Sequence, residues 1–140
     1  MFDNINPLLW GPHSWKMMHY ITMAYPDDPS VEDKENIKNF FSSLKNVLPC
    51  ENCRVHFELN LKKHPLNNNV LSCKYNLINW LNDIHNEVNI RTGKKTYTYN
   101  ELIKEYSNKK TNYNVEVVTV ILLILIIVII LIYAKIKFFD

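Results

Sequence analysis

The sequence predicts an all-α protein, in which an antiparallel bundle of short helices is followed by one separate apolar helix. Apolar residues recur at the three- and four-residue spacing of amphipathic helices, and no segment shows the alternation of a half-buried strand. The connections between the helical segments are short, which is typical of antiparallel helices. Near the C-terminus, Val117 to Ala134 is continuously apolar apart from Thr119.

Composition excludes several classes of function. The chain has only two glycines, which argues against a glycine-rich phosphate loop or a turn-dense β fold. A net charge of +2 gives no broad basic face, so we expect no nucleic-acid partner. Three cysteines are too few for a disulfide-framework protein. The first residues lack the basic start and apolar run of a signal peptide.

The first two helices are predicted from turn and capping residues. Gly11 and Pro12 suit a turn into a helix, so the first helix should open within Trp10-Gly11-Pro12-His13-Ser14-Trp15. Its buried face would carry Trp15, Met18, His19 and Thr22. Ser30 and Asp33 form a capping-box-like start for the second helix, which Pro49 stops. Its apolar face would carry Ile37, Phe40, Phe41, Leu44 and either Val47 or Leu48.

The next three helices follow in the same way. The third begins at the cysteine pair and runs through Leu61. Ser72 is predicted to cap the fourth, which Thr92-Gly93 ends. The inward residues of the fourth helix would be Tyr75, Leu77, Ile78, Leu81, Ile84 and Val88. Asn100 is predicted to cap a short fifth helix that reaches Tyr106.

The pattern divides the chain into a domain at 1–106, a polar linker at 107–114, a transmembrane helix at 115–136 and a short tail at 137–140. The apolar run is long enough to cross roughly 30 Å of hydrocarbon. A buried core helix is the alternative, but a domain this small could not cover such a helix on all sides.

The segment Pro49-Cys50-x-x-Cys53 carries the most chemistry. The spacing brings both thiols to one helix face, within reach of a disulfide, and a helix N-terminus favours the thiolate. Spacing alone leaves three interpretations: a redox-active disulfide, a zinc half-site completed by His56 and His64, or two inert buried thiols.

Three motifs, taken in order, resemble the Erv/ALR family of FAD-linked sulfhydryl oxidases. They are Trp10-Gly11-x-x-x-Trp15-x-x-x-His19, Pro49-Cys50-x-x-Cys53 and Trp80-Leu81-x-x-x-His85-Asn86-x-Val88-Asn89. The resemblance implies a four-helix bundle plus a short fifth helix, with FAD in the mouth of the bundle. The chain is similar to the minimal oxidases of large cytoplasmic DNA viruses. It departs from many members at Asn82 and Tyr99, which match the positions of a structural disulfide.

The resemblance also implies the roles of individual residues. Cys50 and Cys53 would be catalytic: Cys53 would face the flavin, Cys50 would exchange with substrate thiols, and electrons would pass to O2 to release H2O2. No metal is expected. The implied FAD contacts are Gly11, Trp15, His19, His56, His85, Asn86, Val88, Asn89, Lys94, Lys95 and Tyr99.

Several of these contacts have a plainer interpretation from the residues alone. Trp15 and His19 suit an ordinary core, the asparagines suit an Asn-rich chain, and Lys94 and Lys95 suit a solvated loop. Cys73 has no evident partner.

The predicted protein is a membrane-anchored, single-pass thiol oxidase that forms disulfides in protein substrates. We expect its domain to face the cytosol, on a virion or a host intracellular membrane. The family often dimerises, so the resemblance allows a homodimer. The alternative function is a membrane-anchored zinc-binding adaptor that uses Cys50, Cys53, His56 and His64.

Overall fold

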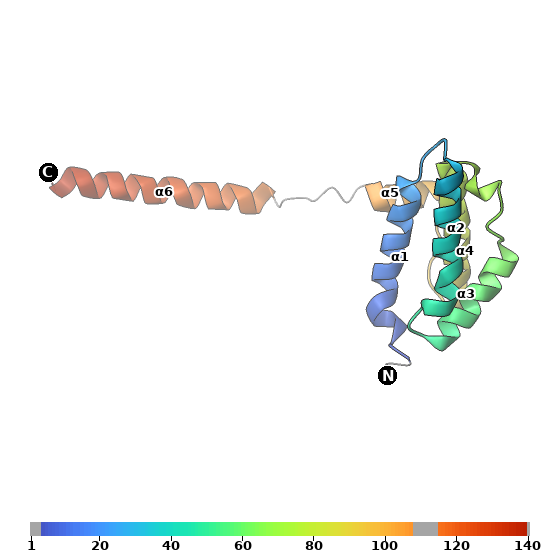
Figure 1. Ribbon diagram of the computed structural model, residues 1–140. Coiled ribbons are helices and arrows are strands. Elements are labelled where there is room, and N and C mark those ends of the chain that lie inside the picture. The colour runs from blue at the N-terminus through green and yellow to red at the C-terminus, as the bar shows by residue number, and fades with distance from the viewer. Residues whose placement is uncertain (1–3, 108–114, 140) are drawn as a thin grey trace. The chain divides into compact units, whose positions relative to one another are not determined.

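Four α-helices pack side by side as a bundle in the computed structural model, which describes residues 4–107 and 115–139 (Figure 1). Helix α1 packs on α4, α2 on α3, and α3 on α4. The chain separates into two compact units, Met1–Tyr106 and Ser107–Asp140. The helices of the first are α1 (Pro7–Ala24), α2 (Val31–Val47), α3 (Glu51–Lys63), the 3-10 turn η1 (Val70–Ser72), α4 (Lys74–Arg91) and α5 (Tyr99–Ser107). The predicted all-α bundle with a short fifth helix is confirmed.

Helix α2 begins with the predicted capping box. The Ser30 N–H donates to Asp33 Oδ2 at 2.9 Å, and the Asp33 N–H donates to Ser30 Oγ at 3.1 Å. The two bonds satisfy groups that a helix start otherwise leaves unpaired. Helix α4 ends at Arg91 with Thr92 as its C-cap, as predicted, and Gly93 follows with a φ of 67°, a conformation that glycine adopts without steric cost.

Three predicted helix starts were wrong. Helix α1 begins at Pro7 rather than within the Trp10 motif, because Asn6 caps it by accepting the Leu8 N–H at 3.0 Å. Helix α4 begins at Lys74 after the turn η1, and Ser72 bonds within that turn instead of capping the helix. Helix α5 begins at Tyr99, where Thr98 and Glu101 exchange hydrogen bonds in place of a cap at Asn100.

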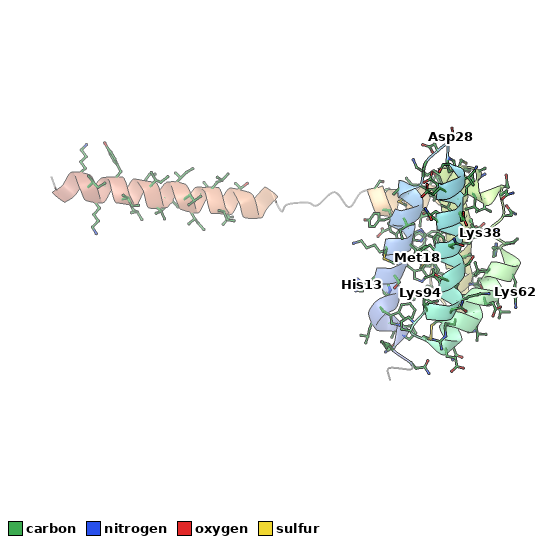
Figure 2. All side chains as sticks on the ribbon, viewed as in Figure 1. His13, Met18, Asp28, Lys38, Lys62 and Lys94 are labelled. Atoms are coloured by element: carbon green, nitrogen blue, oxygen red, sulfur yellow. A yellow bond between two sulfur atoms is a disulfide. The ribbon has the colours of Figure 1, made fainter. Side chains whose placement is uncertain are left out.

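The core of the bundle lies where α2, α3 and α4 meet. Phe41 and Trp80 contact edge to face with ring centroids 5.0 Å apart, and the Trp80 indole N–H donates to the His64 carbonyl at 2.9 Å. Figure 2 shows Met18 among the bundle's side chains and Lys38 and Lys62 on α2 and α3; Met18 is buried and the two lysines are exposed. The buried hydrophobic cluster comprises Met18, Tyr25, Phe41, Leu44, Phe57, Leu71, Leu77, Trp80, Leu81 and Ile84.

Two predicted core positions need comment. Tyr75 was predicted to face inward, but it is exposed at the start of α4, where its ring packs against Tyr99 at 4.8 Å between centroids. Of the two candidates at the end of α2, Leu48 packs against the core and Val47 is exposed.

The second unit contains α6 (Val115–Phe139). Within it, Thr119–Lys137 is long and apolar enough to cross a membrane by length and composition, and none of it is buried in protein. From 120 to 132 the exposed side chains are apolar on every side, which is the pattern of a helix surrounded by lipid or protein. The predicted linker at 107–114 lies, apart from Ser107, outside the described residues, as does Asp140 of the predicted tail.

Candidate active site

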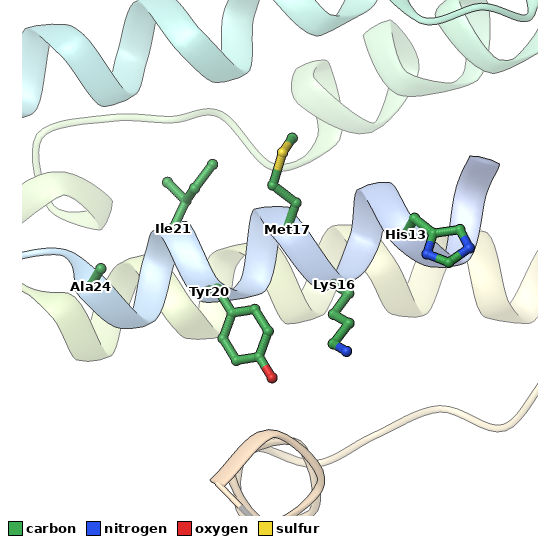
Figure 3. A pocket seen from close by; sticks show the side chains of 6 residues that line it. All are labelled: His13, Lys16, Met17, Tyr20, Ile21 and Ala24. Carbon is green, nitrogen blue, oxygen red and sulfur yellow. The ribbon is translucent and has the colours of Figure 1, made fainter. Parts of the chain in front are cut away.

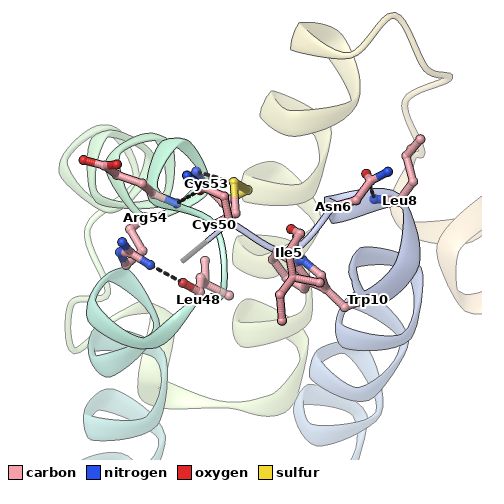
Figure 4. The surroundings of a disulfide bond; sticks show 10 residues. Ile5, Asn6, Leu8, Trp10, Leu48, Cys50, Cys53 and Arg54 are labelled. Atoms are coloured by element: carbon pink, nitrogen blue, oxygen red, sulfur yellow. Dashed lines mark hydrogen bonds between the residues drawn. A yellow bond between two sulfur atoms is a disulfide. The ribbon is translucent and has the colours of Figure 1, made fainter. Parts of the chain in front are cut away.

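A disulfide between Cys50 and Cys53 lies at the first turn of α3 (Figure 4). Cys50 is the N-cap, in an extended conformation, and its Sγ accepts the Cys53 N–H at 3.2 Å. The two Cα atoms are 5.1 Å apart. The Arg54 guanidinium donates to the Leu48 carbonyl at 2.6 Å and thereby ties the end of α2 to this turn. The helix start therefore holds two sulfur atoms in register for thiol–disulfide exchange.

The two cysteines differ in their surroundings. Cys53 is half-buried and lines a cavity of about 700 Å³. Cys50 is only 8% exposed and does not line that cavity. It lies beside the extended segment Asn4–Asn6, in which Asn4 forms an antiparallel bridge with it.

The cavity is formed by α1, Leu48 at the end of α2, the start of α3, the end of α4, the segment before α5 and Tyr106 of α5. Its volume is in the range of small-molecule and cofactor sites. Nine of the predicted site residues line it: Gly11, Trp15, Cys53, His56, His85, Val88, Asn89, Lys94 and Lys95. Cys50 and three predicted FAD contacts, His19, Asn86 and Tyr99, do not.

One wall of the cavity is an aromatic stack. The rings of Trp15 and His85 lie 4.0 Å apart between centroids, with 6° between their planes. His19 is fully buried, and its Nε2 lies 2.9 Å from His85 Nδ1. The first-helix motif and the fourth-helix motif therefore meet at this wall.

The histidine pair has a preferred tautomer. His19 Nδ1 is buried and has no hydrogen-bond partner among the described residues. A proton there would be an unsatisfied buried donor, which is more costly than an unpaired lone pair. The proton of His19 therefore belongs on Nε2, from which it is donated to His85 Nδ1. His85 then carries its own proton on Nε2, as a donor for a ligand.

Both imidazoles are neutral at physiological pH. Burial, followed by the charge of His85, lowers the pKa of His19 to about 3. Burial, followed by the charge of Lys94, lowers the pKa of His85 to about 4. Tyr106 packs against His19 at 4.9 Å between ring centroids, and burial raises the pKa of this phenol to about 12. The buried polar groups of this wall are therefore uncharged.

Cationic side chains line another part of the cavity, near the end of α4. Lys95 pairs with Glu101 at 2.8 Å, and Arg91 donates to the Asn60 side chain at 3.3 Å. Lys94 makes no ion pair within residues 4–107. The Asn89 Nδ2 donor is buried and has no partner among the described groups. These groups can bind an anion or a polar ligand edge.

Asn86 does not line the cavity, and its side chain binds the backbone of Tyr97 instead. Its side chain donates to the Tyr97 carbonyl at 2.8 Å and accepts the Tyr97 N–H at 2.9 Å. Asn82 donates to the same carbonyl at 2.8 Å. These bonds hold the segment after α4 against that helix. Asn82 matches a structural-disulfide position of the resembled family, and here a hydrogen bond joins this residue to the segment after α4.

Sequence reasoning missed several cavity residues, among them Arg91, Tyr97 and Tyr106. Tyr97 lies in the segment after α4, whose path depends on the bonds to Asn86, and Tyr106 lies in α5, which follows that segment. No local spacing could have indicated them. Arg91 follows Val88 and Asn89 on the fourth helix, and a cation so close to those predicted contacts was an available signal.

The zinc site of the alternative function is not assembled. Within the described residues, no three His, Cys, Asp or Glu side chains are arranged to hold a metal ion. His64 is directed to Glu87, with Nε2 3.3 Å from Oε1, and the two sulfur atoms are bonded to each other.

The model of the Erv1/Alr family matches residues 12–108, which is most of the chain. The chain belongs to the Erv1/Alr family. This confirms the family inferred from the three motifs.

Viral members of the Erv1/Alr family are among its relatives. A protein of Acanthamoeba polyphaga mimivirus, named probable FAD-linked sulfhydryl oxidase, is 42% identical over 115 residues, covering 79% of this chain and 80% of the relative. The FAD-linked sulfhydryl oxidase of an African swine fever virus isolate from warthog is 34% identical over 100 residues, covering 71% and 81%. These names agree with the predicted FAD cofactor and thiol oxidase activity.

Solved structures share the fold. The yeast Erv1 core superimposes with a TM-score of 0.68 at 23% identity, covering 76% of this chain and 88% of that one. The FAD-binding domain of Erv1 from Saccharomyces cerevisiae gives 0.67 at 23% identity, covering 74% and 95%. At this identity the likeness establishes the fold.

The cavity residues fit a flavin dinucleotide. The Trp15–His85 stack offers flat aromatic surface for a ring system. The unpartnered Asn89 donor and the cation of Lys94 suit polar ring edges and phosphate oxygens.

Proposed function

We propose that this protein is an FAD-dependent thiol oxidase that forms disulfides in protein substrates: two thiols and O2 give one disulfide and H2O2. One observation carries the proposal. Cys53, half of the disulfide, lines the same cavity as the Trp15–His85 stack. A redox-active pair and an aromatic ligand wall therefore share one site.

The protein's own part of the reaction is an exchange between sulfur atoms. A substrate thiolate attacks Cys50 Sγ, the Cys50–Cys53 bond breaks, and the electron pair leaves with Cys53. A second substrate thiolate displaces Cys50, so the substrate leaves as a disulfide. The N-terminal N–H groups of α3, including that of Cys53, stabilise a leaving thiolate at Cys50. When bound, FAD supplies the two-electron acceptor that O2 reoxidises.

Named residues would hold the cofactor. Trp15 and His85 would pack on a ring, His85 Nε2 and Asn89 would donate hydrogen bonds, and Lys94 would offset phosphate charge. Among the two lysines we favour Lys94, since Glu101 already holds Lys95. Gly11, His56 and Val88 would line the remaining wall. His19 would act through His85.

The visible spectrum of the purified full chain tests this function first. A bound flavin absorbs at about 450 nm as a property of the cofactor. Oxygen uptake with a dithiol, and H2O2 in equal amount, should follow. A colourless protein that consumes no oxygen after incubation with FAD would contradict the proposal.

We propose further that 1–106 is the oxidase domain, 107–114 a linker, 115–136 a membrane anchor and 137–140 a tail. Support comes from the apolar Thr119–Lys137 segment. The domain would face the cytosol on a virion or host intracellular membrane. Flotation of the full chain with lipid vesicles, compared with a chain ending at 107, tests the anchor; protease access to the domain in intact membranes tests its orientation.

A homodimer through α1 completes the proposal. Figure 3 shows Met17, Tyr20 and Ile21 on a hollowed face of α1 that also carries His13, Lys16 and Ala24. Met17 is 52% and Tyr20 41% exposed, so this face of α1 carries two large, uncovered apolar side chains. Light scattering should give twice the monomer mass for the chain ending at 107, and Met17→Lys should return the monomer.

A further inference from the structure

The segment Asn4–Asn6, which precedes α1, covers Cys50 as a short extended strand. The Ile5 N–H donates to the Pro49 carbonyl at 2.9 Å, and Asn4 Oδ1 accepts the Glu51 N–H at 3.1 Å. Asn4 and Cys50 are antiparallel bridge partners. The segment therefore pairs with the backbone on either side of Cys50, and this cysteine is 8% exposed. Figure 4 shows the segment passing beside the disulfide.

The register of this pairing places two side chains together. Ile5 follows Asn4, and Pro49 precedes Cys50, so the hydrogen bond from the Ile5 N–H to the Pro49 carbonyl lies next to the Asn4–Cys50 pair. In an antiparallel ladder this arrangement makes Asn4 and Cys50 a non-hydrogen-bonded pair. In such a pair the Cα atoms are about 4.5 Å apart and the side chains lie on the same face. Disulfides join residues at about that Cα separation.

We infer that the backbone edge Pro49–Glu51 is the docking site for an extended, thiol-bearing segment of the protein substrate. Asn4–Asn6 is its internal occupant, and the substrate cysteine takes the position of Asn4. This inference rests on the proposed function. It deepens that function, because it states how the substrate reaches a cysteine that the fold covers.

The chemistry is balanced in this register. The substrate thiolate, in place of the Asn4 side chain, forms a bond to Cys50 Sγ; the Cys50–Cys53 bond breaks, and Cys53 keeps the electron pair as a thiolate. The Pro49 carbonyl and the Glu51 N–H, which Ile5 and Asn4 release, pair with the substrate backbone. An unpaired Glu51 N–H would otherwise be one of the open donors of the first turn of α3.

The substitution Asn4→Cys tests the register without any added substrate. Oxidised full-length protein is held without oxygen, quenched in acid, alkylated and mapped by mass spectrometry. The introduced thiol should exchange with the native disulfide, so that position 4 is bonded to Cys50 and Cys53 is alkylated. Exchange conserves the number of disulfides and needs no oxidant.

Ile5→Cys is the matched control, because adjacent side chains of an extended strand point to opposite faces. The bond to Cys50 should be several-fold more abundant in Asn4→Cys than in Ile5→Cys. Equal abundance in the two variants, a bond to Cys53 instead of Cys50, or no bond at all in Asn4→Cys would overturn the inference. Circular dichroism confirms that both variants are folded.

A second measurement tests whether the segment Asn4–Asn6 restricts access to Cys50. Asn4→Ala removes the acceptor for the Glu51 N–H; the loss of a hydrogen bond of average net strength raises the open fraction of the segment about fivefold. Reduction of the Cys50–Cys53 disulfide by a small dithiol should accelerate by that factor. Asn39→Ala, the same change at an exposed position of α2, should leave the rate unchanged. An unchanged rate in Asn4→Ala would show that the segment does not restrict access.

Neither measurement depends on flavin or oxygen. If the wild-type protein binds no FAD and consumes no oxygen, the proposed oxidase function fails while these two results still decide the docking site. If oxygen uptake is normal and Asn4→Cys behaves like Ile5→Cys, the oxidase function stands and the docking site fails.

Discussion

His19 Nε2 and His85 Nδ1 lie 2.9 Å apart and join α1 to α4 behind the aromatic wall of the cavity. A hydrogen bond between two imidazoles requires one donor and one acceptor, so a second proton on His85 at the acceptor nitrogen Nδ1 would break it. Burial acts in the same direction and lowers the pKa of both residues. Both rings are therefore neutral at physiological pH.

The first prediction concerns stability against pH. Both histidines have folded-state pKa values, about 3 for His19 and about 4 for His85, that lie below the unfolded value of about 6.5. The unfolded chain therefore binds more protons below that pH, and the stability present at neutral pH is lost as pH falls from about 6.5 toward 4. Urea unfolding at pH 7 and pH 5 measures the loss.

Two variants separate the contribution of the histidine pair to this pH dependence from that of the other ionisable groups. His19→Gln should flatten the dependence between pH 7 and pH 5, because one depressed group is removed. His13→Gln changes an exposed histidine of the same helix and should leave the dependence as in the wild type. Equal slopes in all three proteins would show that the pair does not set the acid sensitivity.

The second prediction distinguishes the roles of the cysteines in thiol oxidation. Cys53→Ser should abolish oxygen-dependent thiol consumption, because the electron pair of the broken disulfide has no sulfur to receive it. Cys73→Ser should retain the wild-type rate, since Cys73 is a free thiol and does not line the cavity. Oxygen uptake with a dithiol measures both. Wild-type turnover in Cys53→Ser would exclude the Cys50–Cys53 pair as the redox centre.

The third prediction concerns the segment that Asn86 holds. Asn86→Ala leaves both backbone groups of Tyr97 with fewer partners and should cost about 2 kcal/mol of unfolding free energy. FAD retention should fall as well, because Tyr97 lines the cavity. Asn79→Ala is the control, since that half-buried side chain donates to the Tyr75 carbonyl one turn earlier in α4 and not to the segment after the helix, among the described residues. If the two variants lose the same stability, the bonds to Tyr97 are not what holds the segment.

The fourth prediction distinguishes the two lysines. Lys94→Ala should weaken FAD binding about fivefold, the effect of losing one charge-assisted contact, and this loss should shrink at high salt. Lys95→Ala should have a smaller effect, because Glu101 already neutralises that ammonium. Fluorescence titration of the FAD-free variants provides the dissociation constants. The reverse order would assign the phosphate contact to Lys95.

The fifth prediction links the cofactor to folding. No disulfide of the described residues joins α4 to the segment beyond it, so bound FAD should contribute much of the stability of the domain. Thermal unfolding with and without excess FAD should differ by several degrees. Coincident transitions would contradict this link.

Much of the fold could be predicted because its signals are local. The spacing of Ile37, Phe41 and Leu44 indicates a helix without reference to any other segment, as does the Ser30–Asp33 capping box. Helix starts were less predictable, because several capping residues compete at each one. At α1, Asn6 and Pro7 begin the helix before the Trp10 motif, within which the sequence predicts its start.

The sequence by itself determined the helical segments, the paired sulfur atoms and the apolar run of α6, because each depends on residues within a few positions of one another. Only the tertiary structure decided that His19 bonds His85, that Asn86 binds the Tyr97 backbone and that Asn4 lies opposite Cys50. Those contacts join different segments of the chain. Their hydrogen bonds form only once packing has brought the segments together, so they leave no spacing pattern along the sequence.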